Sequence, residues 1–226
     1  MDNNLSTLDS IPFGFYIKTF KPDYDLTRAL VASIEHFCPD IPIIIIPDDD
    51  YTQESLLGHP TMISKDPMLV QLKGYFKKLW CFFGPLERFI YLDSDSLIVR
   101  NIDDVINLAK STAPPFVYVC NESKTFSPYS KYQESHRPFY QSVIGDLSLL
   151  KKLDPSYSFE GNYPFNSSLI ISNRGVINPK NLTLAFSNAQ LLHKELNLPP
   201  LNNSRKGLFM GDQGLINYLI YKEGIR

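Results

Sequence analysis

Two aspartates, Asp93 and Asp95, stand one residue apart at the end of an apolar run over residues 89–92. On a β-strand, side chains at positions i and i+2 point to the same face, so these carboxylates are expected to converge on one hard cation. A divalent ion held by two carboxylates keeps open positions for phosphate oxygens, which suits Mg²⁺ or Mn²⁺ beside a diphosphate. The pair predicts a metal site for a nucleotide-linked substrate, although Asp in this pattern also ends strands and caps helices.

The composition argues against several classes of partner. The chain has 226 residues, enough for one large domain or two small ones, and a single domain of this length buries roughly 70–75% of its unfolded surface. Its net charge is −2, so no basic field exists to hold nucleic acid or an anionic membrane. The apolar run at residues 43–46 is far too short to span a bilayer, and the polar N-terminus does not resemble a signal peptide. We therefore expect a cytoplasmic protein.

The three cysteines, Cys38, Cys81 and Cys120, are widely spaced and lie among apolar residues. This pattern favours reduced, packed thiols over a disulfide framework or a zinc site. The four histidines stand singly and are expected to be surface residues or hydrogen-bonded interior residues.

Apolar segments alternate with segments of helical periodicity, which is typical of an α/β sheet covered on both faces. Strands are expected at residues 13–20, 42–46, 88–92, 116–120 and 168–172. Helices are expected at residues 26–37, 69–83, 103–109, 145–153, 181–196 and 211–221. Residues 121–164 are rich in Tyr, Ser and Pro, which indicates either an insertion that faces an acceptor or a plain surface excursion.

Further motifs accompany the two aspartates. They are KLWC at residues 78–81, YLDSDSL at 91–97, NIDDV at 101–105, FNSS at 165–168 and GDQGLIN at 211–217. In residue type, order and approximate spacing, these motifs resemble the core of the glycogenin-like family 8 glycosyltransferases. The resemblance runs from about residue 13 to about residue 217 and is strongest between the first and third motifs.

The resemblance implies a single GT-A nucleotide-diphospho-sugar transferase domain over residues 1–226, with a central, mostly parallel twisted sheet flanked by helices. About residues 1–100 would form the nucleotide-binding half, and about residues 101–226 the half for the donor sugar and acceptor. The implied enzyme is hexosyltransferase-like, uses Mn²⁺ or Mg²⁺, and moves a sugar from a UDP-sugar with retention of configuration. The acceptor, whether carbohydrate, lipid-linked or protein, is not identified.

Carried over position by position, the resemblance assigns roles to single residues. Asp93 and Asp95 match the metal-binding pair, with Asp95 the firmer direct ligand and Asp93 bridging metal and ribose. Lys78 matches a basic residue that contacts the donor; a solvated lysine on a helix face is the alternative. Asn166 matches an amide that lines the sugar pocket.

The same comparison gives Asp212 and Gln213 the role of holding donor-sugar hydroxyls beside the reacting carbon. Asp212 is equally suited to cap a helix, and both roles can coexist. Independently of the resemblance, a metal with a nearby lysine stabilises the charge on a departing diphosphate without proton transfer. The carbonyl dipole of a neutral Gln213 is suited to stabilise a cationic transition state at the anomeric carbon.

Thr19 lies at the end of the first expected strand and Tyr24 just after it, where a base and ribose would sit at the carboxyl edge of the sheet. Tyr24 is suited to stack on uracil and equally to simple packing. The three aspartates at residues 48–50 favour a solvated acidic loop over a second metal site, because like charges so placed repel one another.

Two positions depart from the family pattern. Ser168 stands where a glycine usually follows F-N-S, which keeps the backbone further from the sugar. The family takes its third metal ligand from a histidine beyond the G-D-Q helix, and no histidine follows Gln213 here. Either the given sequence stops short of that ligand, or a short variant completes its metal shell with water.

Two other functions stay open. A haloacid-dehalogenase-type phosphatase also places D-x-D after an apolar strand, with the first Asp attacking phosphate. That motif normally lies near the N-terminus and has a downstream acidic pair, whereas Asp212 is not followed by a second acid. The other function is a non-catalytic sugar-nucleotide-binding domain that keeps the fold without turnover.

Overall fold

The computed structural model describes residues 10–111, 116–118, 145–157, 165–201, 208–209 and 211–225. The chain divides into two compact units. The first unit comprises Met1–Val117 with Ser168–Val176, and the second comprises Tyr118–Ser167 with Ile177–Arg226. The prediction of one domain with halves that meet near residue 100 stays a prediction.

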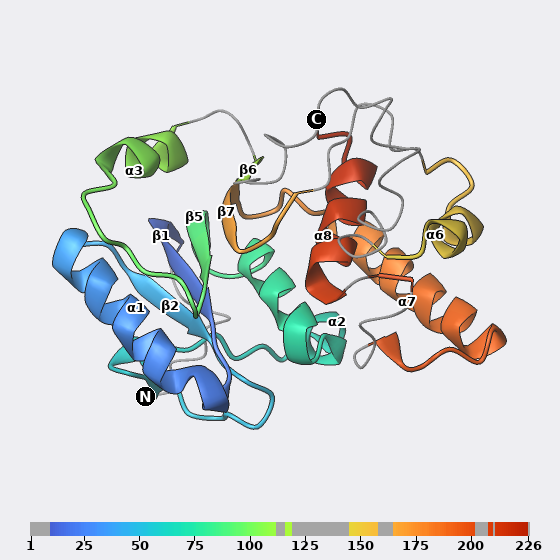
Figure 1. Ribbon diagram of the computed structural model, residues 1–226, viewed down its shortest axis with the longest axis horizontal. Helices are drawn as coiled ribbons and strands as arrows, with labels where there is room; N and C mark the ends of the chain where they lie inside the picture. The colour runs from blue at the N-terminus through green and yellow to red at the C-terminus, as the bar shows by residue number, and fades with distance from the viewer. Residues whose placement is uncertain are drawn as a thin grey trace. The chain divides into compact units, whose positions relative to one another are not determined.

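The main sheet has five strands within the described residues, in the order β2-β1-β5-β7-β6 (Figure 1). These strands are β1 (Ile11–Lys18), β2 (Ile43–Ile46), β5 (Leu86–Asp93), β6 (Phe116–Tyr118) and β7 (Leu169–Asn173). β1 pairs in parallel with both β2 and β5, whereas β7 runs antiparallel to β5. A mostly parallel sheet was expected, and the structure confirms it.

Most of the expected helices are present, with ends that differ by a few residues. The helices are α1 (Tyr24–Phe37), α2 (Pro67–Gln71), α3 (Asp103–Lys110), α6 (Leu147–Leu153), α7 (Pro179–Glu195) and α8 (Gly211–Lys222). The described residues also form the 3₁₀ helices η2 (Lys21–Asp23) and η3 (Gly74–Phe82) and a short hairpin of β3 (Ser55–Leu56) and β4 (His59–Pro60). Among these helices, none is both long enough and apolar enough to cross a bilayer. Cys120 and most of the expected insertion at residues 121–164 lie outside the described residues.

The prediction of a single helix over residues 69–83 is wrong. The chain forms α2, becomes extended at Leu72 and Lys73, and then forms η3. Gly74 adopts a φ of +55°, a conformation that glycine reaches without steric cost, and this turns the chain between the two helices. Because residues 76–82 are all buried, the apolar positions that suggested one helical stripe belong to a segment buried on every side.

The two faces of the sheet are both covered, so the strand interiors are apolar. Phe15 and Ile90 belong to a core cluster that also contains side chains of α1 and α3, and Figure 1 shows α1 lying along the sheet. On the other face, the ring of Phe89 lies 5.5 Å from that of Phe82 in η3. Strands buried on both faces are expected to be continuous apolar runs in sequence, and β2 and residues 89–92 of β5 are such runs.

Tyr16 places a hydroxyl group inside this second core layer. Its side chain is 0% exposed, and its Oη accepts the backbone N–H of Leu86 at 3.1 Å. Burial raises the pKa of Tyr16 far above the usual value, so the phenol stays neutral. Gly84 makes the space, because a Cβ at that position would overlap with the hydroxyl.

We expect Tyr16→Phe to lower the free energy of unfolding by about 1–3 kcal/mol, because the N–H of Leu86 would lose its acceptor inside the core. Urea denaturation measures the difference. Tyr221→Phe is the matched control: this hydroxyl donates to the carbonyl of Ser156 at an exposed position, where water can replace it. Equal losses in the two variants would contradict a special role for the buried hydroxyl.

Candidate functional site

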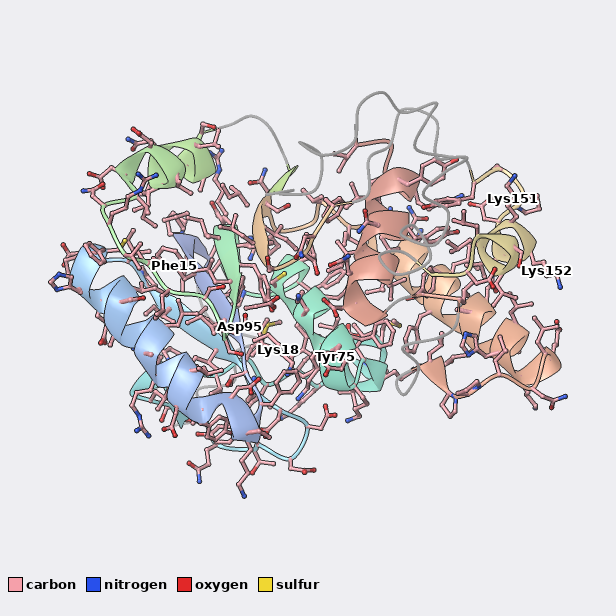
Figure 2. All side chains as sticks on the ribbon, in the orientation of Figure 1. Phe15, Lys18, Tyr75, Asp95, Lys151 and Lys152 are labelled. Carbon is pink, nitrogen blue, oxygen red and sulfur yellow. The ribbon has the colours of Figure 1, made fainter. Side chains whose placement is uncertain are left out.

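The carboxyl ends of the parallel strands lie at one edge of the sheet. The register pairs Lys18, the last residue of β1, with Ile46 at the end of β2 and with Asp93 at the end of β5. Figure 2 labels Lys18 and Asp95 at this edge. Polar residues at the ends of apolar strands therefore lie together at the carboxyl edge of the sheet in the first unit.

Asp93, the last residue of β5, forms an ion pair with a buried lysine of η3. Its Oδ1 accepts a hydrogen bond from Tyr91 Oη at 2.6 Å and lies 2.9 Å from Lys78 Nζ. The Lys78 ammonium also lies 4.9 Å from the centroid of the Tyr91 ring. Lys78 is only 6% exposed, whereas the Asp93 side chain is 31% exposed. Lys78 is thus a buried, ion-paired residue rather than a solvated one.

Asp95 lies beyond the end of β5, so the expectation that Asp93 and Asp95 alternate on one strand is wrong. β5 ends at Asp93, and the N–H of Ser96 donates to the Asp93 carbonyl at 3.1 Å, which closes a turn. The alternation of strand side chains therefore does not apply to Asp95. Its side chain is exposed, and within the described residues its carboxylate makes no hydrogen bond or ion pair.

The described residues contain no group of three or more His, Cys, Asp or Glu side chains that could hold a metal. Asp93 and Asp95 are nevertheless of the ligand type that a hard cation takes, since Mg²⁺ is commonly held by one or two carboxylates while water and substrate phosphates fill the other positions. The donor atoms at this edge are oxygens, as such a cation prefers. Asp95 has the exposed carboxylate that this arrangement needs.

Lys18 was not predicted, although it ends an otherwise apolar strand and is 3% exposed. Its ammonium donates to the carbonyl of Thr19 at 2.8 Å and lies 3.6 Å from the centroid of the Phe20 ring. A lysine at the last position of a buried strand is the signal that could have singled it out. The edge therefore carries more buried positive charge than the net charge of the chain suggests.

The acidic loop at residues 48–50 is bonded to its neighbours as well as solvated. Lys77, another buried lysine that was not predicted, donates to the carbonyls of Pro47 at 3.1 Å and Asp48 at 2.8 Å. Its Nζ lies 3.4 Å from a carboxylate oxygen of Asp49. Burial lowers the pKa of Lys77, and the charge of Asp49 opposes that shift. The loop and η3 are thus joined by a charged contact.

Thr19 and Tyr24 occupy the start of the connection from β1 to α1. The Thr19 side chain is 0% exposed, and its hydroxyl shares a short hydrogen bond with that of Thr27. The Tyr24 hydroxyl donates to Asp48 at 3.2 Å, and burial together with the Asp48 charge raises the pKa of Tyr24 to about 12. Donor binding by these two residues stays a prediction, and for Thr19 the side chain already holds the turn into α1.

In the second unit, the first turn of α8 holds the F-N-S segment. Asp212 Oδ2 accepts the hydroxyl of Ser167 at 3.1 Å, and Gln213 Oε1 accepts the Ser167 N–H at 3.4 Å. Asn166 is exposed between the buried residues Phe165 and Ser167. The structure therefore brings together the three residues predicted to contact the donor sugar. Asp212 lies inside the first turn, where the helix dipole favours a negative charge.

Asn217 is a further residue of this group, and its role was not predicted. Its Oδ1 accepts the N–H of Phe165 at 3.1 Å, and its Nδ2 donates to the carbonyls of Phe165 at 3.0 Å and Gln213 at 2.8 Å. Asn217 closes the G-D-Q-G-L-I-N motif one helical turn after Gln213, so the two share a helix face. That spacing is the signal that could have found it.

Other chemically active side chains in the described residues serve packing. His193 is buried; its Nδ1–H donates to the carbonyl of Pro199 at 2.6 Å, and its Nε2 accepts the N–H of Leu208 at 3.3 Å. Cys38 and Cys81 are free and buried, as expected. Burial raises the pKa of Cys81, which keeps the thiol protonated.

No protein-family model and no curated protein sequence matches the chain. Solved glycosyltransferase structures do match. The galactosyltransferase LgtC, in complex with donor and acceptor sugar analogs, aligns with a TM-score of 0.50 and 10% identity over 90% of this chain and 69% of its own. Mouse xyloside xylosyltransferase 1 aligns at 0.51 and 14%, over 95% and 83%. Core-mannan synthase A from Aspergillus fumigatus, in its Mn and GDP form, aligns at 0.50 and 12%, over 97% and 73%.

At identities of 10–14%, these matches establish the fold and nothing narrower. The described residues have the expected α/β architecture, a mostly parallel sheet flanked by helices, and the three alignments cover at least 90% of the chain. The narrower assignment to the glycogenin-like family 8 stays a prediction. The chain has the GT-A fold of glycosyltransferases.

Proposed function

We propose that the chain is a metal-dependent, hexosyltransferase-like enzyme that transfers a sugar from a UDP-sugar to an acceptor with retention of configuration. The ion pair of buried Lys78 with Asp93 at the end of β5, next to the exposed carboxylate of Asp95, supports this proposal most strongly. Ligands of open α/β sheets bind at the carboxyl ends of the strands, which is where this group lies. Carbohydrates, lipid-linked sugars and proteins are all candidate acceptors.

The first unit would bind the cation and the diphosphate. Asp95 would be the direct ligand of Mn²⁺ or Mg²⁺, and Asp93 would bridge the metal and the ribose. When bound, the cation would offset the negative charge of the diphosphate. Lys78 adds a positive charge already held in place by Asp93, so little reorganisation is needed as the sugar–phosphate bond breaks.

Tyr24 would bind the nucleoside at the same edge, with the support of Thr19. The hydrogen bond to Asp48 fixes the Tyr24 hydroxyl, which gives a partly buried ring suited to stack on uracil. Thr19 would act indirectly, because its hydroxyl is engaged with Thr27 and holds the turn between β1 and α1.

Asn166, Asp212 and Gln213 of the second unit would bind the donor sugar. Asn166 is exposed and carries an amide, a group suited to bind sugar hydroxyls, and Asp212 and Gln213 both bond to the neighbouring residue Ser167. A neutral glutamine would stabilise positive charge at the anomeric carbon through its carbonyl dipole. Because the charge on the departing diphosphate would be stabilised without proton transfer, this chemistry requires no general acid to protonate the leaving group.

Binding of UDP should depend on a divalent cation and on Asp95. Calorimetry with Mn²⁺ is expected to show at least a tenfold loss of UDP affinity, about 1.4 kcal/mol, on addition of EDTA or in Asp95→Asn. The Asp95 carboxylate has no partner in the described residues, so the substitution should leave the fold intact. Asp40→Asn, an exposed carboxylate just before β2, is the control and should bind UDP normally. Equal affinity for UDP with and without metal would contradict a metal site at Asp93 and Asp95.

The consecutive lysines of η3 allow a matched comparison. Lys78→Met should weaken binding of UDP with Mn²⁺ by tenfold or more, because the ammonium that meets the diphosphate is removed. Lys77→Met removes an equally buried ammonium that is bonded to the loop at residues 47–49, and it should weaken UDP binding much less. Thermal unfolding of both variants separates loss of stability from loss of affinity. Similar affinities for the two variants would show that Lys78 is a structural residue.

Gln213→Ala should lower kcat much more than it raises KM for the UDP-sugar. An interaction that strengthens as positive charge develops contributes more to the transition state than to the ground state. Steady-state transfer to a panel of acceptors, with UDP release as the readout, gives both constants. A change confined to KM would make Gln213 a plain binding residue, and donor binding without any transfer by the wild type would favour a non-catalytic binding domain.

A further inference from the structure

We infer that Asn217 is a positioning residue that fixes the backbone of residues 165–167 and thereby directs Asn166 toward the donor sugar. The inference rests on the proposed function and adds to it the element that shapes the sugar pocket. Asn217 touches neither the sugar nor the reacting atoms in this scheme. It acts through Phe165 and through Gln213.

The amide of Asn217 is used almost completely by its neighbours. The side chain is 7% exposed, its carbonyl oxygen accepts the N–H of Phe165, and both of its N–H donors meet backbone carbonyls, one of Phe165 and one of Gln213. An asparagine offers two donors and one acceptor oxygen, so no apolar side chain of this size can replace it. Asn217 pairs with both backbone polar groups of Phe165 as a neighbouring strand would.

The F-N-S segment is held at two points on either side of Asn166. Asn217 holds the backbone of Phe165, while Asp212 and Gln213 hold the hydroxyl and the N–H of Ser167. Phe165 and Ser167 are buried, and the side chain between them is exposed. Rotation of the backbone at either point would turn Asn166, so its direction depends on both attachments.

The same side chain ties the segment to the helical turn that carries Gln213. Nδ2 of Asn217 donates to the Gln213 carbonyl one turn earlier, which fixes the rotamer of Asn217 relative to α8. Binding groups held in advance in their bound geometry lose less conformational freedom when the ligand arrives. Loss of Asn217 should therefore weaken recognition of the sugar and leave recognition of the nucleotide unchanged.

The test compares affinities for UDP and for UDP-sugars in the presence of Mn²⁺. The probes are UDP, UDP-glucose, UDP-galactose and UDP-xylose, and the readout is the ratio of the Kd for the tightest sugar nucleotide to the Kd for UDP. Asn217→Leu, of similar size but without hydrogen-bonding groups, should raise this ratio at least tenfold. Hydrogen exchange of the Phe165 amide should become at least tenfold faster in the same variant, since its acceptor is gone.

Leu219→Ala is the matched control for a general loss of helix stability. Leu219 is fully buried two residues further along α8, and that spacing places it on the opposite side of the helix from Asn217. This variant should lower the melting temperature without changing the affinity ratio or the exchange of the Phe165 amide. If Asn217→Leu does not fold, Asn217→Asp keeps the acceptor for the Phe165 N–H, loses both donors, and should still raise the ratio.

The outcomes separate the two proposals. A folded Asn217 variant whose affinity ratio stays within twofold of the wild type overturns the positioning role, as does an equal change in Leu219→Ala. A wild-type chain that binds neither UDP nor any UDP-sugar with Mn²⁺ overturns the proposed function. In that case faster exchange at Phe165 in Asn217→Leu, but not in Leu219→Ala, still supports the backbone attachment.

Discussion

The covering of both faces of the sheet is the constraint on which the candidate site depends. Side chains in the interiors of β1, β2 and β5 have apolar neighbours above and below, so a charged group within them would be desolvated without compensation. Charge appears where the strands end, at Lys18 and Asp93, which the parallel register places side by side. The position of the site thus depends on strand length as well as on the motif. If the Asp93 carboxylate stood earlier in β5, it would lie among the apolar side chains of the core.

The helix η3 distributes positive charge along this edge. Lys77 and Lys78 are consecutive, yet one bonds the loop after β2 and the other the end of β5. Rings at Trp80 and Tyr91 lie 4.8 Å and 4.9 Å from their respective ammonium groups, which adds a cation–π attraction to each ion pair. Buried charges are tolerated when they are paired and hydrogen-bonded. Lys77 has carboxylate, carbonyl and aromatic partners, and Lys78 has a carboxylate and an aromatic partner.

The sequence predicted the strands and most helices because their apolar patterns are long and regular. It failed at residues 69–83, where a segment buried on every side shows no face from which an α-helix could be told from a broken pair of helices. Asp93, Asp212 and Gln213 could be predicted as site residues from the sequence because their motifs are local, and their roles stay predictions. Asn217 was missed because its partner Phe165 is 52 positions away along the chain. A short sequence motif does not reveal a contact between one of its residues and a residue far away in the sequence. Lys18 was missed for another reason: its contacts with Thr19 and Phe20 are close in sequence, and only its place at the end of β1 sets it apart.

The strand β7 belongs to the sheet of the first unit, yet it is encoded between two segments of the second unit. During synthesis, β1, β2 and β5 emerge long before β7, so β5 presents an open edge of unpaired N–H and C=O groups until residues 169–173 arrive. Pairing across such a sequence distance is slow compared with helix formation. Until β7 is synthesised, the unpaired edge of β5 is open to pairing with other chains. A shortened chain that ends before β7 would keep this unpaired edge permanently.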